Sequence, residues 1–549
     1  MRCVLLLCLA AGGLSAQLMR APQVPRPVTG TGSIQGTVST GGDGQPLRKA
    51  GVMLSGAIST PLRAVTDASG AFSFQALPAG NYWLNASKIG YQTRQDLFGS
   101  GSSVEVSLGD GEQRKDVHIE LTAAGSISGR VVNEDGFPIR GCMIAALRPG
   151  YEQGRAMLQE MNGASSDDKG EYRIDNLTPD RYYLFARCMR LLPAAHPLLP
   201  HGDPRIPHET YQPQFYGGGV DPSSATAVKV AGGASMEGFD FRLSRVPAFT
   251  LRGSIDGATR AWGPINVMLL PANMSLRNVM ITGASVNYAR RTFEIQPVVP
   301  GTYRLFAFRR MDNRMMLGER MVQVSNTPPD PVEITLSGGQ DLRGTVQFDS
   351  DDHAPLENCQ VSLVPLEGYF FVPQPNARVD ADGSFTLTGV QPGEWRLSVS
   401  TLGYPKSVVL GGQEVSPYGF HIAPGVGPLE IVIGSRMADV HVNVKGTGSG
   451  GRVYALIFPE DLSHLGAGQE RVSAATGNDQ FGFGALAPGH YRVFATDAPN
   501  PWAILQRPDL LRVLENRTAA VDVPEGGQAT VTVEMIPHVE LARIVAGSE

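Results

Sequence analysis

The stretch Asp67–Tyr82, DASGAFSFQALPAGNY, decides the fold, because its two phenylalanines alternate with small or polar residues. Alternation with a period of two is typical of a β-strand with one buried face. Asp67 can accept hydrogen bonds from the backbone of the turn before that strand, and Gly70 tolerates a positive φ there. The segment Leu77–Tyr82 predicts a second turn and the start of the next strand.

A similar arrangement returns four more times along the chain, with the apolar and Gly positions at one spacing. Such self-similarity is typical of a repeat architecture in which each copy is one structural unit. Each copy follows an apolar first strand such as Ile34–Val38, and several close with an alternating strand such as Val117–Leu121. Strands at roughly 8–12-residue intervals, with turn residues between them, are typical of a β-sandwich. The aromatic residues that close the five motifs are Tyr82, Tyr182, Tyr303, Trp395 and Tyr491.

We therefore expect an all-β protein, a tandem array of about five β-sandwich modules. Their limits follow from the first and last strands of each copy, and the spacers between them are only a few residues long. Such short spacers should hold neighbouring modules close together. Modules 1 to 5 are expected at residues 33–122, 125–246, 249–337, 340–435 and 438–536, followed by a tail at 537–549.

The composition supports this class of protein and excludes others. The 549 residues include 65 Gly and 40 Pro, about 19% together, while 42% are hydrophobic, enough to build cores. The net charge of −6 provides no positive field for phosphates, so no nucleic-acid partner is expected. The apolar content excludes a disordered chain.

The N-terminus has the pattern of a secretory signal peptide at residues 1–16. Arg2 precedes the apolar segment Val4–Leu14, and Ala16 gives the small residue that signal peptidase requires. A short buried helix and a lipoprotein signal at Cys8 are the alternatives. No stretch of the chain reaches the 18 or so apolar residues that a membrane-spanning helix needs. We expect a secreted or periplasmic protein, with a Pro-rich linker at 17–32 before the first module.

The motifs together resemble the carboxypeptidase regulatory-like domain family. The resemblance is carried by Gly-x-Val in the first strand, Pro46–Val52, the Asp-x-x-Gly turn and Leu77–Tyr82, and by their counterparts in modules 2 and 4. Modules 3 and 5 are degenerate, because they lack the Asp-x-x-Gly turn. The resemblance implies a transthyretin/prealbumin-like (Ig-like) β-sandwich, grouped with carbohydrate-binding-like folds, and an extracytoplasmic setting. It implies no catalytic residues of its own.

The sequence carries no motif for the enzymes that accompany such domains. No His is followed by Glu three residues later, and no Gly-x-Ser-x-Gly is present. Gly446–Gly451 matches a dinucleotide-binding pattern, but a strand follows it where a helix would be needed. Acidic turns such as Asp349–Asp352 lack a calcium-loop pattern and are expected to be solvated. We expect no enzyme activity, no cofactor and no metal.

Exposed aromatic side chains are the candidates for ligand binding, because they can stack on sugar rings or anchor protein partners. Two lie in loop-like segments, and three lie in a Pro-rich insertion of module 2 at about 190–230. Local packing is the alternative for each of them. The candidate residues are Trp262, Trp502, Tyr211, Phe215 and Tyr216. A second insertion, Pro501–Arg517, predicts one short helix.

Cys142 and Cys188 both lie in module 2, so a disulfide between them is one expectation for an oxidising compartment. The alternative is that each is a small buried residue on a strand, as Cys359 is expected to be.

The function that fits these observations is a non-catalytic extracytoplasmic binding or scaffold protein. The expected partner is a carbohydrate, which the resemblance suggests, or an envelope or extracellular protein. Two alternatives stay open: an accessory or relative of a zinc carboxypeptidase, and a protein–protein adhesion module of the cell envelope.

Overall fold

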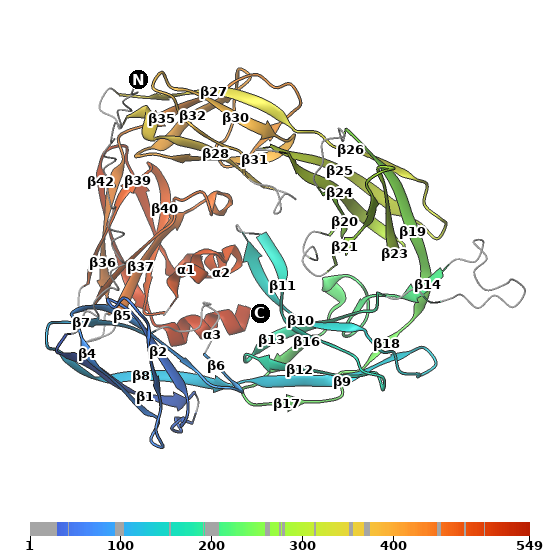
Figure 1. Cartoon of the computed structure of the whole chain (residues 1–549). Helices are drawn as coiled ribbons and strands as arrows, with labels where there is room; N and C mark the ends of the chain where they lie inside the picture. The colour runs from blue at the N-terminus through green and yellow to red at the C-terminus, as the bar shows by residue number, and fades with distance from the viewer. Residues whose placement is uncertain are drawn as a thin grey trace, which may run out of the picture. The chain divides into compact units, whose positions relative to one another are not determined.

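The computed structural model describes residues 30–548 apart from 42, 94–103, 153–154, 190–191, 193–207, 258–263, 274–275, 277–279, 312–313, 351–354, 367–373, 447–451, 477–478 and 499. The expected signal peptide and nearly all of the linker after it therefore lie outside the described residues. The chain divides into two compact units, residues 1–89 with 102–121, and residues 90–101 with 122–549. Strands dominate both units (Figure 1), which confirms the all-β, sandwich-based fold class.

Module 1 has two four-stranded sheets. Its central strand β1 runs antiparallel to β4 and parallel to β8, so the first and last strands of the repeat lie side by side. One sheet holds β1 (Gly32–Thr40), β4 (Ala71–Leu77), β6 (Tyr91–Thr93) and β8 (Gln113–Ala123), and the other holds β2 (Gly51–Gly56), β3 (Leu62–Val65), β5 (Gly80–Ser87) and β7 (Val104–Leu108).

Modules 2 and 3 repeat this plan with two sheets each. In module 2, β9 (Gly125–Asn133) pairs with β12 (Glu171–Leu177), β17 (Ser235–Met236) and β18 (Phe241–Leu243), and β10 (Met143–Glu152), β11 (Arg155–Ser165), β13 (Asp180–Arg187), β15 (Gln214–Phe215) and β16 (Ala227–Val230) form the other sheet. In module 3, β19 (Arg245–Asp256) joins β22 (Ser285–Asn287), β23 (Thr292–Val298), β26 (Val332–Thr335) and β14 (His208–Tyr211), opposite β20 (Asn266–Pro271), β21 (Thr282–Gly283), β24 (Gly301–Met311) and β25 (Arg314–Val324).

Modules 4 and 5 complete the array. In module 4, β27 (Gln340–Phe348), β30 (Ser384–Val390), β32 (Tyr404–Leu410), β33 (Gln413–Glu414) and β35 (Leu429–Gly434) lie opposite β28 (Gln360–Pro365), β29 (Asn376–Arg378), β31 (Gly393–Ser400) and β34 (Phe420–Ile422). Module 5 has two groups of strands. One group holds β36 (Ala438–Lys445), β39 (Gln480–Leu486) and β42 (Gln528–Ile536), and the other holds β37 (Arg452–Pro459), β38 (Arg471–Thr476), β40 (Gly489–Thr496) and β41 (Ala519–Val523). The pairing of β40 with β42 joins the two groups into one sheet.

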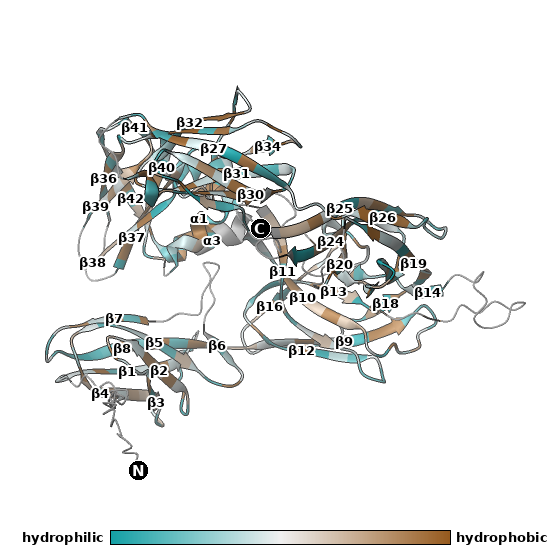
Figure 2. Ribbon diagram, turned by 45° about the horizontal axis from the view of Figure 1, so that its top comes forward, coloured by the Kyte–Doolittle hydropathy of each residue, from teal (hydrophilic) through white to brown (hydrophobic). Residues whose placement is uncertain are grey.

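The motif that opened the sequence analysis forms the expected turn. In module 1, the Asp67 Oδ1 accepts hydrogen bonds from the backbone N–H groups of Ser69 and Ala71, each at 2.9 Å, and Gly70 has a φ of +74°. Phe72 and Phe74 of β4 are buried while Ser73 between them is exposed. Figure 2 shows the same alternation as brown and teal bands along many strands.

The aromatic residue that closes each motif makes the same hydrogen bond in all five copies. Its ring hydroxyl, or the indole N–H in module 4, donates to the backbone carbonyl four residues earlier, which holds the turn against the next strand. The five pairs are Tyr82–Pro78 (2.7 Å), Tyr182–Thr178 (2.8 Å), Tyr303–Val299 (2.9 Å), Trp395–Gln391 (2.9 Å) and Tyr491–Ala487 (3.0 Å).

A glycine of the first strand sits where the backbones come closest. In module 4, a Cβ on Gly344 would lie 2.2 Å from the Leu429 carbonyl oxygen and 2.3 Å from the Phe385 ring. A Cβ on Gly36, Gly129 or Gly253 would lie equally close to a backbone carbonyl oxygen. Module 5 has the buried Val442 at this position, consistent with its degenerate motif.

The two insertions carry more regular structure than the sequence analysis expected. The module 2 insertion contributes β14, β15 and β16, and the module 5 insertion holds two short helices where one was expected, α1 (Pro501–Leu505) and α2 (Pro508–Val513). Each helix begins at a proline, which is well suited to the first helical position. The expected tail forms a third helix, α3 (His538–Ser548).

Candidate functional site

The structure separates the five candidate aromatic residues into different surroundings. Trp262 lies outside the described residues, and Trp502 lies on α1 with 48% of its surface exposed. Tyr211 and Phe215 are buried, with exposures of 6% and 0%, so neither offers a ring face to a ligand. Tyr216 is half-buried and packs on Phe239 and Phe241.

The insertion of module 2 instead builds a junction with module 3. Strand β14 pairs antiparallel with the beginning of β19, from His208 opposite Ala248 to Tyr211 opposite Arg245. The Phe215 ring packs on Phe185 at a centroid distance of 4.8 Å. Both belong to an apolar cluster that includes Leu276, which lies in the range of module 3. Tyr211 and Phe215 therefore pack inside the protein, which was the alternative to ligand binding.

A disulfide joins Cys142 and Cys188 in the structure, with their Cα atoms 4.3 Å apart. Cys142 lies just before β10 and Cys188 just after β13, and these two strands pair antiparallel. The bond therefore crosses between neighbouring strands of one sheet. Cys359 is free and buried, and its thiol donates to the Thr401 hydroxyl at 3.2 Å.

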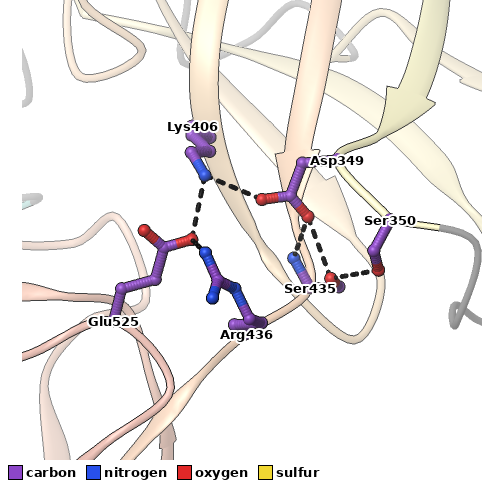
Figure 3. Close-up of polar contacts among 6 residues, drawn as sticks. All are labelled: Asp349, Ser350, Lys406, Ser435, Arg436 and Glu525. Carbon is purple, nitrogen blue, oxygen red and sulfur yellow. Dashed lines mark hydrogen bonds and ion pairs between the residues drawn. The ribbon is translucent and has the colours of Figure 1, made fainter.

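A cluster of polar and charged side chains lies at the junction of modules 4 and 5 (Figure 3). The Lys406 Nζ on β32 donates to the Asp349 Oδ2 at 2.8 Å and to the Glu525 Oε1 at 2.9 Å. Glu525 lies in the turn between β41 and β42 of module 5, and its Oε1 also accepts from the Arg436 Nη2 at 3.1 Å. We call Asp349, Lys406, Arg436 and Glu525 the linker clamp.

The linker clamp holds the residues that connect the two modules. On the module 4 side, the Asp349 Oδ1 accepts from the Ser435 backbone N–H at 3.0 Å and from its hydroxyl at 2.9 Å. On the module 5 side, the Gly526 N–H donates to the Arg436 carbonyl at 3.1 Å. Successive residues of the linker are therefore gripped from opposite sides, which restricts rotation about its backbone bonds.

The electrostatics of the linker clamp favour fully charged groups. Hydrogen bonds from Lys406 and Ser435 hold the pKa of Asp349 well below its usual range, and those to Asp349 and Glu525 raise the pKa of Lys406. The Lys406 and Arg436 cations likewise lower the pKa of Glu525. A charged ammonium beside charged carboxylates forms ion pairs and is not a nucleophile. Lys406 therefore holds Asp349 and Glu525 together as an ion-pair partner.

A second set of contacts reinforces the same junction. Arg396 of β31 is only 5% exposed, and its Nη1 donates to the Leu465 carbonyl of module 5 at 3.0 Å. The Tyr418 ring of module 4 stacks on His464 with a centroid distance of 3.7 Å. Burial lowers the pKa of His464, against the opposing effect of Asp461, which favours the neutral imidazole that stacks on the tyrosine.

The sequence analysis missed the linker clamp. It noted Asp349 only as part of an acidic turn expected to be solvated. The one available signal was the short spacer itself, because a tight joint needs partners for the polar groups around it. Among the described residues, no three His, Cys, Asp or Glu side chains gather as a metal site would require, and no helix there is long and apolar enough to cross a membrane.

Comparison with solved structures finds similar chains among pilins. The minor pilin GBS52 of Streptococcus agalactiae is 15% identical with a TM-score of 0.21, over 39% of this chain and 97% of the pilin chain. The shaft pilin SpaA of Lactobacillus rhamnosus GG is 10% identical with a TM-score of 0.19, over 39% and 97%. Scores this low carry no argument about function.

Comparison with curated proteins finds no match. The model of the carboxypeptidase regulatory-like domain matches residues 33–122, which is the range expected for module 1. This match agrees with the motifs quoted from that range and with its two packed four-stranded sheets. Over residues 33–122, the chain is therefore similar to the carboxypeptidase regulatory-like domain family.

Proposed function

We propose that this chain is a non-catalytic extracytoplasmic scaffold protein that presents binding surfaces on firmly joined β-sandwich modules. The observation that carries the proposal is the junction of modules 4 and 5, where the linker clamp grips the connecting residues from both sides. A chain whose modules only had to be tethered would need no such contacts. The disulfide between Cys142 and Cys188 supports an oxidising compartment.

Trypsin tests whether the junction is held. The bond after Arg436 lies in the linker, and the Arg436 side chain is 67% exposed, so its protection depends on the restrained backbone and on the ion pair with Glu525. In the full mature chain we expect slow cleavage there, and cleavage at least about fivefold faster in Glu525→Gln and Asp349→Asn, because proteolysis follows the open population. Glu534→Gln, an exposed carboxylate on β42, is the control. Rapid cleavage of the unaltered chain would overturn the proposal.

For the ligand, we propose a carbohydrate, on the support of the family resemblance and of the exposed Trp502. A glycan array with residues 17–549 tests this, beside a Trp262→Ala/Trp502→Ala variant. Trp83→Ala, which removes an exposed tryptophan from module 1, is the matched control. Glycan binding that only the double variant loses supports the proposal. A silent array rejects carbohydrate and favours an envelope or extracellular protein, to be sought by affinity capture.

A further inference from the structure

The disulfide of module 2 lies beside the segment that connects module 2 to module 3. Cys188 is the residue directly after β13, and the Thr210 hydroxyl of β14 donates to the Cys188 carbonyl at 3.1 Å. Thr210 is only 2% exposed. Tyr211, the next residue of β14, packs in the same core as both cysteines. The position of β14 therefore depends on the position of Cys188.

Strand β14 in turn holds the first strand of module 3. It pairs with residues 245–248 at the beginning of β19, and β19 continues into module 3, where it pairs with β23 and β26. The Gln212 N–H adds a hydrogen bond to the Ser244 carbonyl at 3.0 Å. A continuous series of contacts therefore runs from the disulfide through β14 into the sheet of module 3.

A second contact between the two modules also leads to the disulfide. Leu276, in the range of module 3, is 3% exposed and belongs to the apolar cluster that contains Phe185 and Phe215 of module 2. Phe185 lies on β13, the strand that ends directly before Cys188. Module 3 is therefore packed on the strand that leads to the disulfide.

Both cysteines are shielded from reagents in this arrangement. Cys142 is 0% exposed and Cys188 is 4% exposed, so a reductant reaches the bond only after the structure around it opens. A cavity of about 30 Å³ between modules 2 and 3 borders Cys188. It has room for roughly two water molecules, which is too little for a thiol reagent.

We propose that the disulfide between Cys142 and Cys188 is a redox-sensitive restraint on the junction of modules 2 and 3. A dithiol reductant opens it in two exchange steps. The first thiolate bonds to one cysteine sulfur and displaces the other, and the second thiol of the reagent then displaces the remaining cysteine and closes a disulfide within the reagent. Two electrons and two protons pass to the cysteines. Cys188 is then no longer fixed to Cys142, so β14 loses the partner that positions it on β19.

The effect must run in both directions, because two linked equilibria influence each other equally. A bond that stabilises the junction is itself protected while the junction stays closed. Reduction should therefore loosen β14 and the beginning of β19, and a weakened junction should speed reduction. This inference goes beyond the proposed function, because it concerns how a different junction responds to a reductant.

Amide hydrogen exchange of the full mature chain, with and without a dithiol, tests the first direction. We expect exchange in β14 and in residues 245–248 of β19 to rise at least about tenfold on reduction, while β36 and β39 of module 5 keep their rates. A Cys142→Ser/Cys188→Ser variant should exchange like the reduced chain and should not respond to the dithiol. Loosening confined to β10 and β13 would overturn the inference, because the bond would then restrain only module 2.

The rate at which a dithiol reduces the bond, read by alkylation and intact mass, tests the second direction. Leu276→Ala should speed reduction at least about tenfold, since it removes a packed side chain from the contact between the modules. Leu505→Ala changes an equally buried leucine of module 5 and should leave the rate unchanged. Thr210→Val, which removes the donor to Cys188, should speed reduction about fivefold, and Thr345→Val at an exposed strand position of module 4 should not.

Equal reduction rates in Leu276→Ala and Leu505→Ala, or in Thr210→Val and Thr345→Val, would overturn the inference. So would cysteines 142 and 188 that are alkylated without any reductant. Tryptic protection at Arg436 reports on the linker clamp at another junction, so the scaffold proposal and this inference stand or fall separately.

Discussion

Gly344 shows how a single residue sets the distance between two strands. The Leu429 carbonyl and the Phe385 ring occupy the space that a Cβ would need. We predict that Gly344→Ala lowers the local free energy of opening by about 1–3 kcal/mol, because backbone or ring must move. Amide hydrogen exchange of β27 and β35 measures this.

Gly482→Ala is the control for Gly344→Ala, because nothing lies within 4 Å of the added Cβ. In this variant, the local free energy of opening should change by no more than about 0.5 kcal/mol. Equal effects of the two substitutions would contradict the close contact that the structure places at Gly344.

Tyr491 carries the second residue-scale prediction. Its hydroxyl donates to the Ala487 carbonyl, and burial raises its pKa, so it stays a donor at any ordinary pH. Tyr491→Phe should cost about 1 kcal/mol by leaving that carbonyl without its partner. Exchange in β39 and β40 should rise about fivefold, while Tyr288→Phe, at an exposed tyrosine, should leave it unchanged. No change in Tyr491→Phe would mean that water replaces the bond without cost.

At the scale of elements, the disulfide ties the two central strands β10 and β13 of module 2. Reduction, or Cys142→Ala, should destabilise the module by about 2–4 kcal/mol, because the open chain regains conformational freedom. Intact mass of the non-reduced chain, before and after alkylation, tests whether the bond forms. Two alkylated cysteines at 142 and 188 without prior reduction would contradict it.

The strands were predictable because their signals are local. Alternation around Phe72 and Phe74 and the turn at Gly70 depend only on neighbours in the chain, and five copies make the pattern unmistakable. The strand β14 was not predictable, because its partner strand β19 lies in the next module. Helix α1 was missed because its five residues show too little periodicity, although the proline at its start was a usable signal.

The candidate site was much less predictable than the fold. Tyr211 and Phe215 looked like exposed loop aromatics, yet contacts with distant residues bury them. The linker clamp joins Lys406 to Glu525, residues 119 apart, through side chains that one sequence presents as ordinary surface charges. Only the packing of one module on the next gives such residues their partners.

At the scale of the whole molecule, the linker clamp makes the junction of modules 4 and 5 dependent on pH. The pKa of Asp349 and that of Glu525 are lowered in the folded chain. These carboxylates therefore stabilise the junction fully above their ordinary pKa values near 4, and this stabilisation is lost as the pH falls from there through the lowered values. The pKa of Lys406 is raised, so its contribution holds up to about pH 10.4 and is lost above. The lowered pKa of His464 adds a weaker loss below about pH 6.5.

We therefore expect a well-defined junction between about pH 7 and pH 10, loosening in two steps on acidification. Asp349→Asn should blunt the lower step and leave the His464 step in place. Spin labels on the two modules, read as a distance distribution at each pH, follow both steps. A width that does not change at any pH below about 4 would contradict the role given to these carboxylates.

The most direct test of a firmly joined scaffold is that distance distribution at pH 7. Labels at Thr386→Cys on β30 and Thr532→Cys on β42, both exposed, report on modules 4 and 5 in a Cys359→Ala background of residues 17–549, which leaves out Cys3 and Cys8. We predict one narrow peak, which broadens in Glu525→Gln but not in Glu534→Gln. A broad distribution in the chain with an intact linker clamp would show that the modules move independently, and would contradict the account.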